Sequence, residues 1–439
     1  MPFEKICVLG LGYIGLPTAC TFATTGIRVV GVDTNPHVVE TLNGGGLHLH
    51  EPGLRALVAD ALASGNLTVV AEPQPADAFI IAVPTPFREN QTGIHDGREY
   101  KLADLGAVRS AAQSIAPVLR AGNLVVLEST SPVGTTRDLL TPILEGSGLK
   151  AGKDFNLCYS PERVLPGQIL RELVENARII GGLTPECARR GHGLYSLFVR
   201  GEIDETDATT AEMVKLMENT FRDVNIAVAN EFARVASKSG VDVWEAISLA
   251  NRHPRVNILS PGPGVGGHCI SVDPWFLVES APELTPLIST ARRVNDDQPE
   301  FVVSLIAQSF GSLRDRRIAA LGLAYKPDVD DLRESPALEV VRRLARRGAR
   351  VTSWEPFAAG RTLAGVESAA GLPEALAGAD LIVLLVPHKQ FVALTPAEIS
   401  GLTPARLVFD AVNAWSSEEW SAAGFTVRRL GDGRAARTS

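Results

Sequence analysis

The sequence lacks the features that mark secreted, membrane-spanning or nucleic-acid-binding proteins. Its five cysteines, at positions 7, 20, 158, 187 and 269, are scattered and include no CxxC pair, which argues against a disulfide framework or a metal site. The net charge of -8 argues against a nucleic-acid-binding protein, which would show a basic domain or stripe. There is no readable signal peptide and no apolar run of 18 residues, so we expect no membrane partner and a reduced, cytoplasmic location.

A glycine motif near the start of the chain predicts dinucleotide binding. A strand-like run leads into Gly10-Leu11-Gly12-Tyr13-Ile14-Gly15, a helical pattern follows, and the next strand stops at Asp33. In this context Gly10 makes the tight turn, Gly12 lets a pyrophosphate reach the helix N-terminus, and Gly15 lets helix and strand pack closely. A carboxylate at Asp33 would bind the ribose hydroxyls and repel a 2′-phosphate, so the motif predicts NAD rather than NADP.

Two later apolar runs continue a parallel sheet. Residues 78–83 end in Pro84-Thr85-Pro86, and residues 124–127 end in Glu128-Ser129-Thr130. Open α/β sheets bind ligands at the carboxyl ends of their strands. Thr85 and Thr130 are therefore candidates for the cofactor side of the site, although ordinary turn-forming threonines would look the same.

The middle of the chain is helical over residues 207–239, longer than most helices in globular proteins. Such a helix commonly bridges domains or builds a dimer interface. Lys215, Asn219 and Arg222 fall on one face of it. A solvated polar stripe is the alternative, but apolar residues such as Ile226 on the same face favour burial.

The last third repeats the first in outline, without a GxGxxG motif. Its elements are a strand at 317–322, a helix at 335–347, and strands at 349–352 and 380–386. The loop between the first strand and the helix carries Lys326 and Arg333, which could serve a phosphate or simply pair with nearby aspartates.

These patterns predict an α/β protein with two Rossmann-like, doubly wound parallel-sheet domains joined by a long central helix and a helical middle region. We expect residues 1–206 to form an NAD-binding domain. Residues 207–312 would form a central helical domain with a dimer interface, and residues 313–439 a second Rossmann-like domain.

Residues 262–276 form a glycine-packed loop with a thiol at Cys269 and a carboxylate at Asp273. Glycines let a substrate approach the main chain closely, and the first turn of a following helix would favour a thiolate. This combination indicates a thiol nucleophile. The alternative is a buried structural cysteine, which is the commoner role of a lone cysteine.

In this order, the elements resemble the nucleotide-sugar 6-dehydrogenase family, which includes UDP-glucose and UDP-N-acetylmannosamine dehydrogenases. The matching motifs, spread over nearly the whole chain, are Gly10 to Gly15, Glu128-Ser129-Thr130, Ser160-Pro161-Glu162-Arg163, Lys215-Leu216-Met217-Glu218-Asn219, Gly266-Gly267-His268-Cys269 and Tyr325-Lys326-Pro327. The resemblance implies oxidation of a sugar CH2OH to a carboxylate with two NAD, for surface polysaccharide biosynthesis. Cys269 would carry a thiohemiacetal and then a thioester that water hydrolyses.

The resemblance also assigns roles to individual residues. Lys215 and Asn219 would stabilise charge on the C6 oxygen, while Glu162 and Asp273 would serve the hydrolysis, with their division of labour left open. The alternative is that Glu162 only forms an ion pair with Arg163. The implied catalytic residues are Cys269, Lys215, Asn219, Glu162, Asp273 and Thr130. The implied cofactor residues are Gly10, Gly12, Tyr13, Ile14, Gly15, Asp33, Thr85, Thr130 and Arg333. The implied substrate residues are Arg163, Val164, Lys215, Asn219, Arg222, His253, Arg255, Gly266 and Lys326, with Arg255 reaching across a homodimer that could associate further.

One departure from the family bears on the sugar. UDP-glucose dehydrogenases generally have Lys-Asp after the nucleophile, whereas this chain has Val272-Asp273, with His268 before the cysteine. This stretch looks most like the UDP-N-acetylmannosamine branch, with UDP-N-acetylglucosamine and UDP-glucose as alternatives. Two other classes remain: a catalytically silent nucleotide-binding regulatory protein, and a two-electron hydroxyacid dehydrogenase, whose chemistry would have no use for Cys269.

Overall fold

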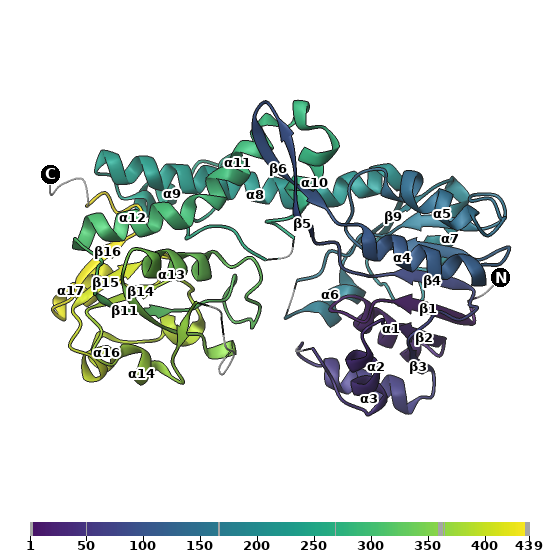
Figure 1. Cartoon of the computed structure of the whole chain (residues 1–439), viewed down its shortest axis with the longest axis horizontal. Coiled ribbons are helices and arrows are strands. Elements are labelled where there is room, and N and C mark those ends of the chain that lie inside the picture. The colour runs from purple at the N-terminus through teal and green to yellow at the C-terminus, as the bar shows by residue number, and fades with distance from the viewer. Residues whose placement is uncertain are drawn as a thin grey trace. The chain divides into compact units, whose positions relative to one another are not determined.

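The computed structural model describes residues 3–49, 51–165, 167–267, 269–358, 363 and 365–434 (Figure 1). Its contacts divide the chain into two compact units. The first unit consists of Met1–Glu218 and Trp275–Leu284, and the second of Asn219–Pro274 and Thr285–Ser439. Each unit is built on a largely parallel sheet with helices, which confirms the predicted fold class.

The first unit contains an eight-stranded sheet in the order β10-β9-β8-β7-β4-β1-β2-β3. Its strands are β1 (Lys5–Leu9), β2 (Arg28–Val32), β3 (Leu67–Val70), β4 (Ala78–Ile81), β7 (Leu124–Leu127), β8 (Asn156–Tyr159), β9 (Arg178–Gly182) and β10 (Ile203–Asp207). Neighbouring strands are parallel except for β8 and β9, which are antiparallel. The strand order reverses between β1 and β4, where doubly wound sheets bind their ligands.

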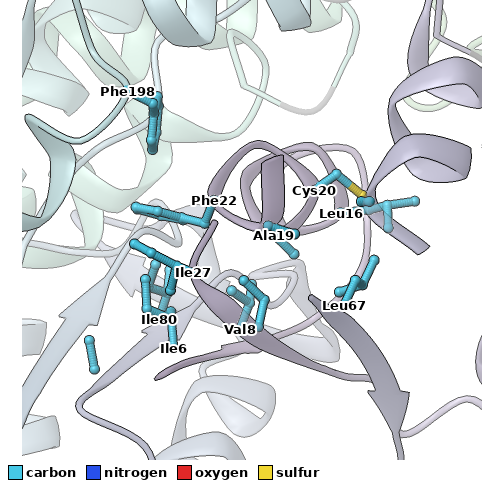
Figure 2. Close-up of a cluster of buried hydrophobic side chains, with 14 of the residues drawn as sticks. Ile6, Val8, Leu16, Ala19, Cys20, Phe22, Ile27, Leu67, Ile80 and Phe198 are labelled. Carbon is cyan, nitrogen blue, oxygen red and sulfur yellow. The ribbon is translucent and has the colours of Figure 1, made fainter. Parts of the chain in front are cut away.

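Helices cover both faces of this sheet because side chains of its central strands alternate between two apolar cores. Ile6 and Val8 of β1 join one core, on the face of the sheet covered by α1 (Figure 2), and Cys7 and Leu9 join the other. The helices of this unit are α1 (Gly15–Thr24), α2 (Pro36–Asn43), α3 (Leu54–Ala63), α4 (Gly106–Ile115), α5 (Thr141–Glu145), α6 (Ile169–Glu175) and α7 (Pro185–Tyr195), with a π-helical segment at Thr135–Leu140. Burial of each large apolar side chain contributes about 1.5–3 kcal/mol.

A hairpin that the sequence analysis did not predict follows β4. Its antiparallel strands, β5 (Phe87–His95) and β6 (Arg98–Ala103), turn at Asp96-Gly97, where both residues have positive φ. It packs on α10 (Asp273–Ser280), since the amide of Ala103 donates to Glu279 at 2.8 Å. The hairpin therefore links the end of β4 to the helix that follows Cys269.

The second unit contains a six-stranded, all-parallel sheet in the order β13-β12-β11-β14-β15-β16. Its strands are β11 (Arg317–Leu321), β12 (Arg350–Trp354), β13 (Glu367–Ser368), β14 (Leu381–Leu384), β15 (Leu407–Asp410) and β16 (Thr426–Arg429). Its helices are α9 (Val243–Ala250), α11 (Pro286–Asp296), α12 (Gln298–Phe310), α13 (Pro336–Arg346), α14 (Leu372–Leu376), α15 (Lys389–Val392), α16 (Pro396–Leu402) and α17 (Ser417–Ala422). The predicted strands and helix of the last third are confirmed to within a few residues.

The long helix α8 (Ala208–Ser239) begins in the first unit and ends in the second. It starts after Asp207, whose carboxylate accepts hydrogen bonds from the amide and hydroxyl of Thr210 and so satisfies the first turn. It ends at Ser239, and the next residue, Gly240, has a φ of 72°. Among the described residues, no helix has the length and apolar character required to cross a membrane.

Candidate active site

The glycine motif forms a turn at the end of β1 in which each glycine has a different surrounding. A Cβ on Gly10, whose φ is +91°, would lie 2.5 Å from the carbonyl oxygen of Ala82, and a Cβ on Gly15 would lie 1.8 Å from that of Gly10. A Cβ on Gly12 would meet nothing within 4 Å. Gly10 and Gly15 are thus required by packing, while Gly12 faces space that a pyrophosphate could fill.

Asp33 lies at the tip of β2 beside this turn. Its carboxylate accepts hydrogen bonds from the amides of Leu11 at 3.0 Å and Asn35 at 2.9 Å, and the side chain is half-buried. The two amides fix its orientation while leaving lone pairs for the ribose hydroxyls of a dinucleotide. Tyr13 and Ile14 complete the turn and are half-buried. The residues of this turn therefore fit NAD.

The loops after β4 and β7 meet at the same edge. The hydroxyl of Thr85 donates to the carbonyl of Thr130 at 2.7 Å, and that of Ser129 donates to the carbonyl of Val83 at 2.7 Å. Farther along, Glu212 of α8 accepts from the amides of Gly134 and Thr136. Sequence analysis missed Glu212, which anchors the segment after Thr130 to α8.

Lys215 and Asn219 lie one turn apart on α8, in the first and second units respectively. Lys215 is only 6% exposed. In the second unit, the side-chain amide of Asn219 donates to the carboxylate of Asp273, which is 1% exposed. The neutral Asn219 amide thus orients a buried carboxylate four residues after Cys269. That Lys215, Asn219 and Asp273 act together in one site remains a prediction.

Cys269 is exposed, whereas the other four cysteines are buried. This finding contradicts the alternative of a buried structural cysteine. The amides of Val272 and Asp273 donate to the carbonyl of Cys269 at 3.0 and 2.8 Å, forming the turn that precedes α10. His268 lies outside the described residues.

The glycines of the cysteine loop let it pack tightly on its surroundings in the second unit. A Cβ on Gly266 would lie 2.3 Å from the carbonyl oxygen of Glu334, and a Cβ on Gly267 would lie 2.7 Å from the ring of Tyr325. The start of the loop is held by Asn230 of α8, which accepts from the amide of Gly262 at 3.0 Å. Asn230 is fully buried and was not found from sequence, because a lone asparagine in a helical pattern carries no motif.

Glu162 follows β8 and forms a buried ion pair with Arg178 of β9. One of its oxygens also accepts from the amide of Arg163 at 2.8 Å. The alternative of a Glu162–Arg163 ion pair is therefore wrong, since the Arg163 guanidinium pairs with Glu218 at 2.8 Å. Sequence analysis missed Arg178, which has no recognisable motif around it.

The remaining predicted ligand residues fall into two groups. Val164 packs against the core of the first unit, whereas Arg222, His253 and Arg255 are exposed in the second. Lys326 is half-buried in the loop after β11. In the same loop Arg333 forms a bidentate pair with Asp331, at 2.8 and 2.6 Å, as one of the two interpretations of this loop expected.

Three segments of the chain match models of one family. Residues 4–199 match the UDP-glucose/GDP-mannose dehydrogenase family, NAD binding domain. Residues 209–297 match its central domain, and residues 319–417 match its UDP binding domain.

The chain is also similar over nearly its whole length to individual nucleotide-sugar dehydrogenases. The chain is 49% identical to NDP-N-acetyl-D-galactosaminuronic acid dehydrogenase of Ralstonia nicotianae, over 96% of this chain and 98% of that protein. It is also 49% identical to UDP-N-acetyl-D-mannosamine dehydrogenase of Yersinia pestis, over 91% and 97%. The solved UDP-D-ManNAc dehydrogenase of Pyrococcus horikoshii has a TM-score of 0.88 at 40% identity, covering 98% of this chain and 99% of that one.

Proposed function

The chain belongs to the UDP-glucose/GDP-mannose dehydrogenase family and is an NAD-dependent oxidoreductase of UDP-sugars, and from this premise we propose that it oxidises UDP-N-acetyl-D-mannosamine to UDP-N-acetyl-D-mannosaminuronate. The observation that carries the chemistry is an exposed Cys269 on a tightly packed glycine loop, close in sequence to the buried Asp273, whose carboxylate accepts a hydrogen bond from Asn219. We assign residues 1–206 to NAD binding, 207–312 to the cysteine loop and connecting helix, and 313–439 to the uridine diphosphate.

The first oxidation requires removal of a proton and a hydride from the C6 alcohol. We assign stabilisation of the C6 oxygen to the Lys215 ammonium and the Asn219 amide, because a buried cation and a neutral donor suit a developing oxyanion. Bound NAD supplies the hydride acceptor, once for each of the two oxidations.

The second oxidation depends on Cys269. Its sulfur adds to the C6 aldehyde carbon, giving a thiohemiacetal that becomes a thioester when it loses its hydroxyl proton and a second hydride. Water then adds to the thioester carbon, the C–S bond breaks, and the thiol returns with a carboxylate as product. Glu162 would take the proton from that water, and Asp273 would orient it. Thr130 completes the proposed catalytic set.

The ligands are assigned to loops at the strand ends. NAD would lie on Gly10, Gly12, Tyr13, Ile14, Gly15, Asp33, Thr85 and Thr130, with Arg333 from the second unit. The UDP-sugar would be held by Arg163, Val164, Lys215, Asn219, Arg222, His253, Arg255, Gly266 and Lys326. Arginine forks suit the oxygens of a diphosphate.

The sugar assignment rests on Val272 and on the names of relatives. Val272 is 8% exposed and stands where UDP-glucose enzymes carry a lysine, so an apolar wall replaces a charged donor and suits an acetamido methyl. The Ralstonia relative makes the galacto isomer a second candidate. Both candidates carry the acetamido group, and a surface polysaccharide precursor is the expected use of the uronate. A cytoplasmic location fits a mechanism that needs a reduced thiol.

A homodimer is part of the proposal. The long helix exposes apolar side chains at Met213, Met217, Phe221, Val228, Phe232 and Val235, whose spacing of three, four or seven places them on one face. Such a stripe is typical of a helix covered by a partner. Phe232→Asp should shift the mass measured by light scattering toward the monomer, and an unchanged mass would contradict an interface along α8.

The central experiment measures NADH per sugar for Cys269→Ala. Wild type should yield two NADH and one uronate per UDP-sugar, and the variant should lose uronate formation while still binding both ligands. Cys187→Ala, which replaces a buried cysteine, is the control. Two NADH per sugar at a near-normal rate in Cys269→Ala would refute the mechanism, and zero NADH in wild type would favour a silent nucleotide-binding protein.

The sugar is tested with a panel of UDP-N-acetylmannosamine, UDP-N-acetylgalactosamine, UDP-N-acetylglucosamine and UDP-glucose. We expect the highest kcat/KM on the first and the lowest on UDP-glucose. A preference for UDP-glucose would overturn the assignment of the sugar and leave the mechanism standing.

A further inference from the structure

A buried cluster of two carboxylates and one guanidinium lies behind Glu162 in the first unit. Glu128 ends β7, Glu162 follows β8, and Arg178 begins β9. Because β9 runs antiparallel to β8, its first residue lies at the edge where β7 and β8 end. The side chains of Glu128, Arg178 and Glu162 are 0%, 4% and 8% exposed.

The guanidinium of Arg178 is held on several sides. One Nη donates to Glu162, and the other donates to the hydroxyl of Ser160 at 3.0 Å and to Glu128 at 3.4 Å. The Cζ atom of Arg178 lies 4.3 Å from the ring centre of Tyr195, whose hydroxyl donates to Glu128 at 2.7 Å. A planar donor fixed in this way offers Glu162 one defined position.

The charges in the cluster do not balance when both acids are ionised, because one buried cation faces two buried carboxylates. Burial raises the pKa of Glu128 to about 7, against the opposing effects of Arg178 and the Tyr195 hydroxyl. Its second oxygen meets no hydrogen-bond partner among the described residues, which costs less on a neutral acid than on a carboxylate. The titratable groups facing Glu128 are Arg178, Glu162, Tyr195 and Cys158.

We propose that Arg178 is a positioning residue that aims Glu162 at the thioester water, and that the protonation of Glu128 sets how strongly Arg178 restrains it. With Glu128 neutral, the whole cationic charge of Arg178 acts on the Glu162 carboxylate and holds it tightly in place. With Glu128 ionised, that charge is shared between the two carboxylates, and Glu162 is restrained less. The inference rests on the proposed role of Glu162, and it predicts control of hydrolysis rather than of the hydride steps.

The test separates hydrolysis from oxidation. Rapid mixing with NAD and the UDP-sugar gives the rate of first NADH formation, and intact mass gives the sugar bound covalently to Cys269. Arg178→Lys keeps the charge but loses the planar fork, so adduct should accumulate and turnover should fall roughly tenfold to a hundredfold, below the ~10²–10⁴ that a general base supplies, with the first NADH rate unchanged. Arg189→Lys, on the exposed side of α7, is the control.

Glu128→Gln supplies an independent measurement. In wild type the hydrolysis rate should rise through an inflection near pH 7, set by the raised pKa of Glu128, and in Glu128→Gln that inflection should be absent. If Arg178→Lys does not fold, the pH dependence of hydrolysis in wild type and Glu128→Gln is sufficient to test the inference. A retained inflection in Glu128→Gln, or an equal loss of both steps in Arg178→Lys, would overturn the inference.

Glu162→Gln distinguishes this inference from the proposed function beneath it. Adduct in Glu162→Gln but none in Arg178→Lys would overturn the positioning role and leave Glu162 as the base. Absence of adduct in both would overturn the role of Glu162 itself, and the positioning role with it.

Discussion

In each of the two large parallel sheets, the first strand along the chain is followed by a glycine with positive φ, 91° at Gly10 and 87° at Gly322. In both sheets the amide after that glycine donates to the carboxylate that ends the next strand, at 3.0 Å to Asp33 and 2.7 Å to Glu355. The two turns then diverge. In the first, α1 begins at Gly15, five residues after the glycine, whereas in the second α13 begins only at Pro336.

The two carboxylates differ in what else they hold. Asp33 is half-buried with capacity left for a ligand. Glu355 is 5% exposed, accepts from three amides, and lies 3.0 Å from the buried ring of His388. The comparison teaches that one kind of turn can have two uses. In the proposed function, the first turn would present its backbone and the Asp33 carboxylate to a dinucleotide. The second turn uses the Glu355 carboxylate to hold a long loop, whose side chains, such as Lys326, would meet the ligand.

The largest effect is expected at Gly15. Its Cβ would lie 1.8 Å from the Gly10 carbonyl oxygen, so Gly15→Ala should destabilise the first unit by about 3 kcal/mol, the upper end for overpacking. Gly12→Ala should barely change stability and instead weaken NAD binding. Urea unfolding and NAD titration of both variants check this. Equal losses of stability in Gly15→Ala and Gly12→Ala would contradict separate roles for the two glycines in packing and in NAD binding.

The next effect concerns Asp33 and Glu355, the carboxylates at equivalent positions in the two sheets. Glu355→Ala would leave the amides of Leu323 and Ala324 without their buried acceptor, at a cost of about 1–3 kcal/mol, and should leave the choice of cofactor unchanged. Asp33→Ala should do the opposite and narrow the preference for NAD over NADP. The measurements are urea unfolding and the ratio of kcat/KM for the two cofactors. An unchanged ratio in Asp33→Ala would place its carboxylate away from the ribose.

A smaller effect is expected on UDP binding by the loop of the second sheet. Lys326→Ala should weaken UDP binding about tenfold, the equivalent of ~1.4 kcal/mol, and should not alter NAD affinity. Lys389→Ala, which removes an exposed lysine of the same unit, is the control. Calorimetric titration with UDP measures the loss, and full affinity in Lys326→Ala would mean that the loop binds through its backbone.

The smallest effect is in the pH dependence of stability. Burial raises the pKa of Glu128 to about 7, so the stability that its neutral form contributes is present below about pH 4.5 and is lost as pH rises through 7. Burial alone would raise the pKa of Glu355, but hydrogen bonding to His388 and the amides lowers it, so its contribution is present above about pH 4.5 and is lost as pH falls below that.

Melting temperatures measured from pH 5 to 8 test these opposite signs. The advantage of Glu128→Gln over wild type should grow by a few degrees across this range, since ~1 kcal/mol shifts Tm by about 2–4 °C in a unit of this size. The difference between Glu355→Gln and wild type should stay level there. A flat difference for Glu128→Gln would contradict the raised pKa.

Much of this fold could be predicted because short buried strands and a GxGxxG turn carry local signals. The β5–β6 hairpin was missed although it contains Asp96-Gly97, a strong turn signal, because its strands are polar and exposed instead of alternating. The Glu128–Arg178 contact was missed for a different reason. It joins residues 50 apart in sequence and exists only because β9 reverses direction beside β8, which depends on the sheet as a whole.

The long helix α8 also fixes the spacing between the segments that it anchors. Glu212, Asn219, Asp223 and Asn230 of α8 each hold a different segment: the loop after β7, the start of α10, α11, and the start of the cysteine loop. Each residue of an α-helix turns the chain by about 100° and advances it by about 1.5 Å. Inserting one residue between Asn219 and Asn230 would therefore turn Asn230 away from the start of the cysteine loop while Asn219 still faces Asp273. The spacing of these anchors should thus tolerate change less than side chains outside the exposed apolar stripe do.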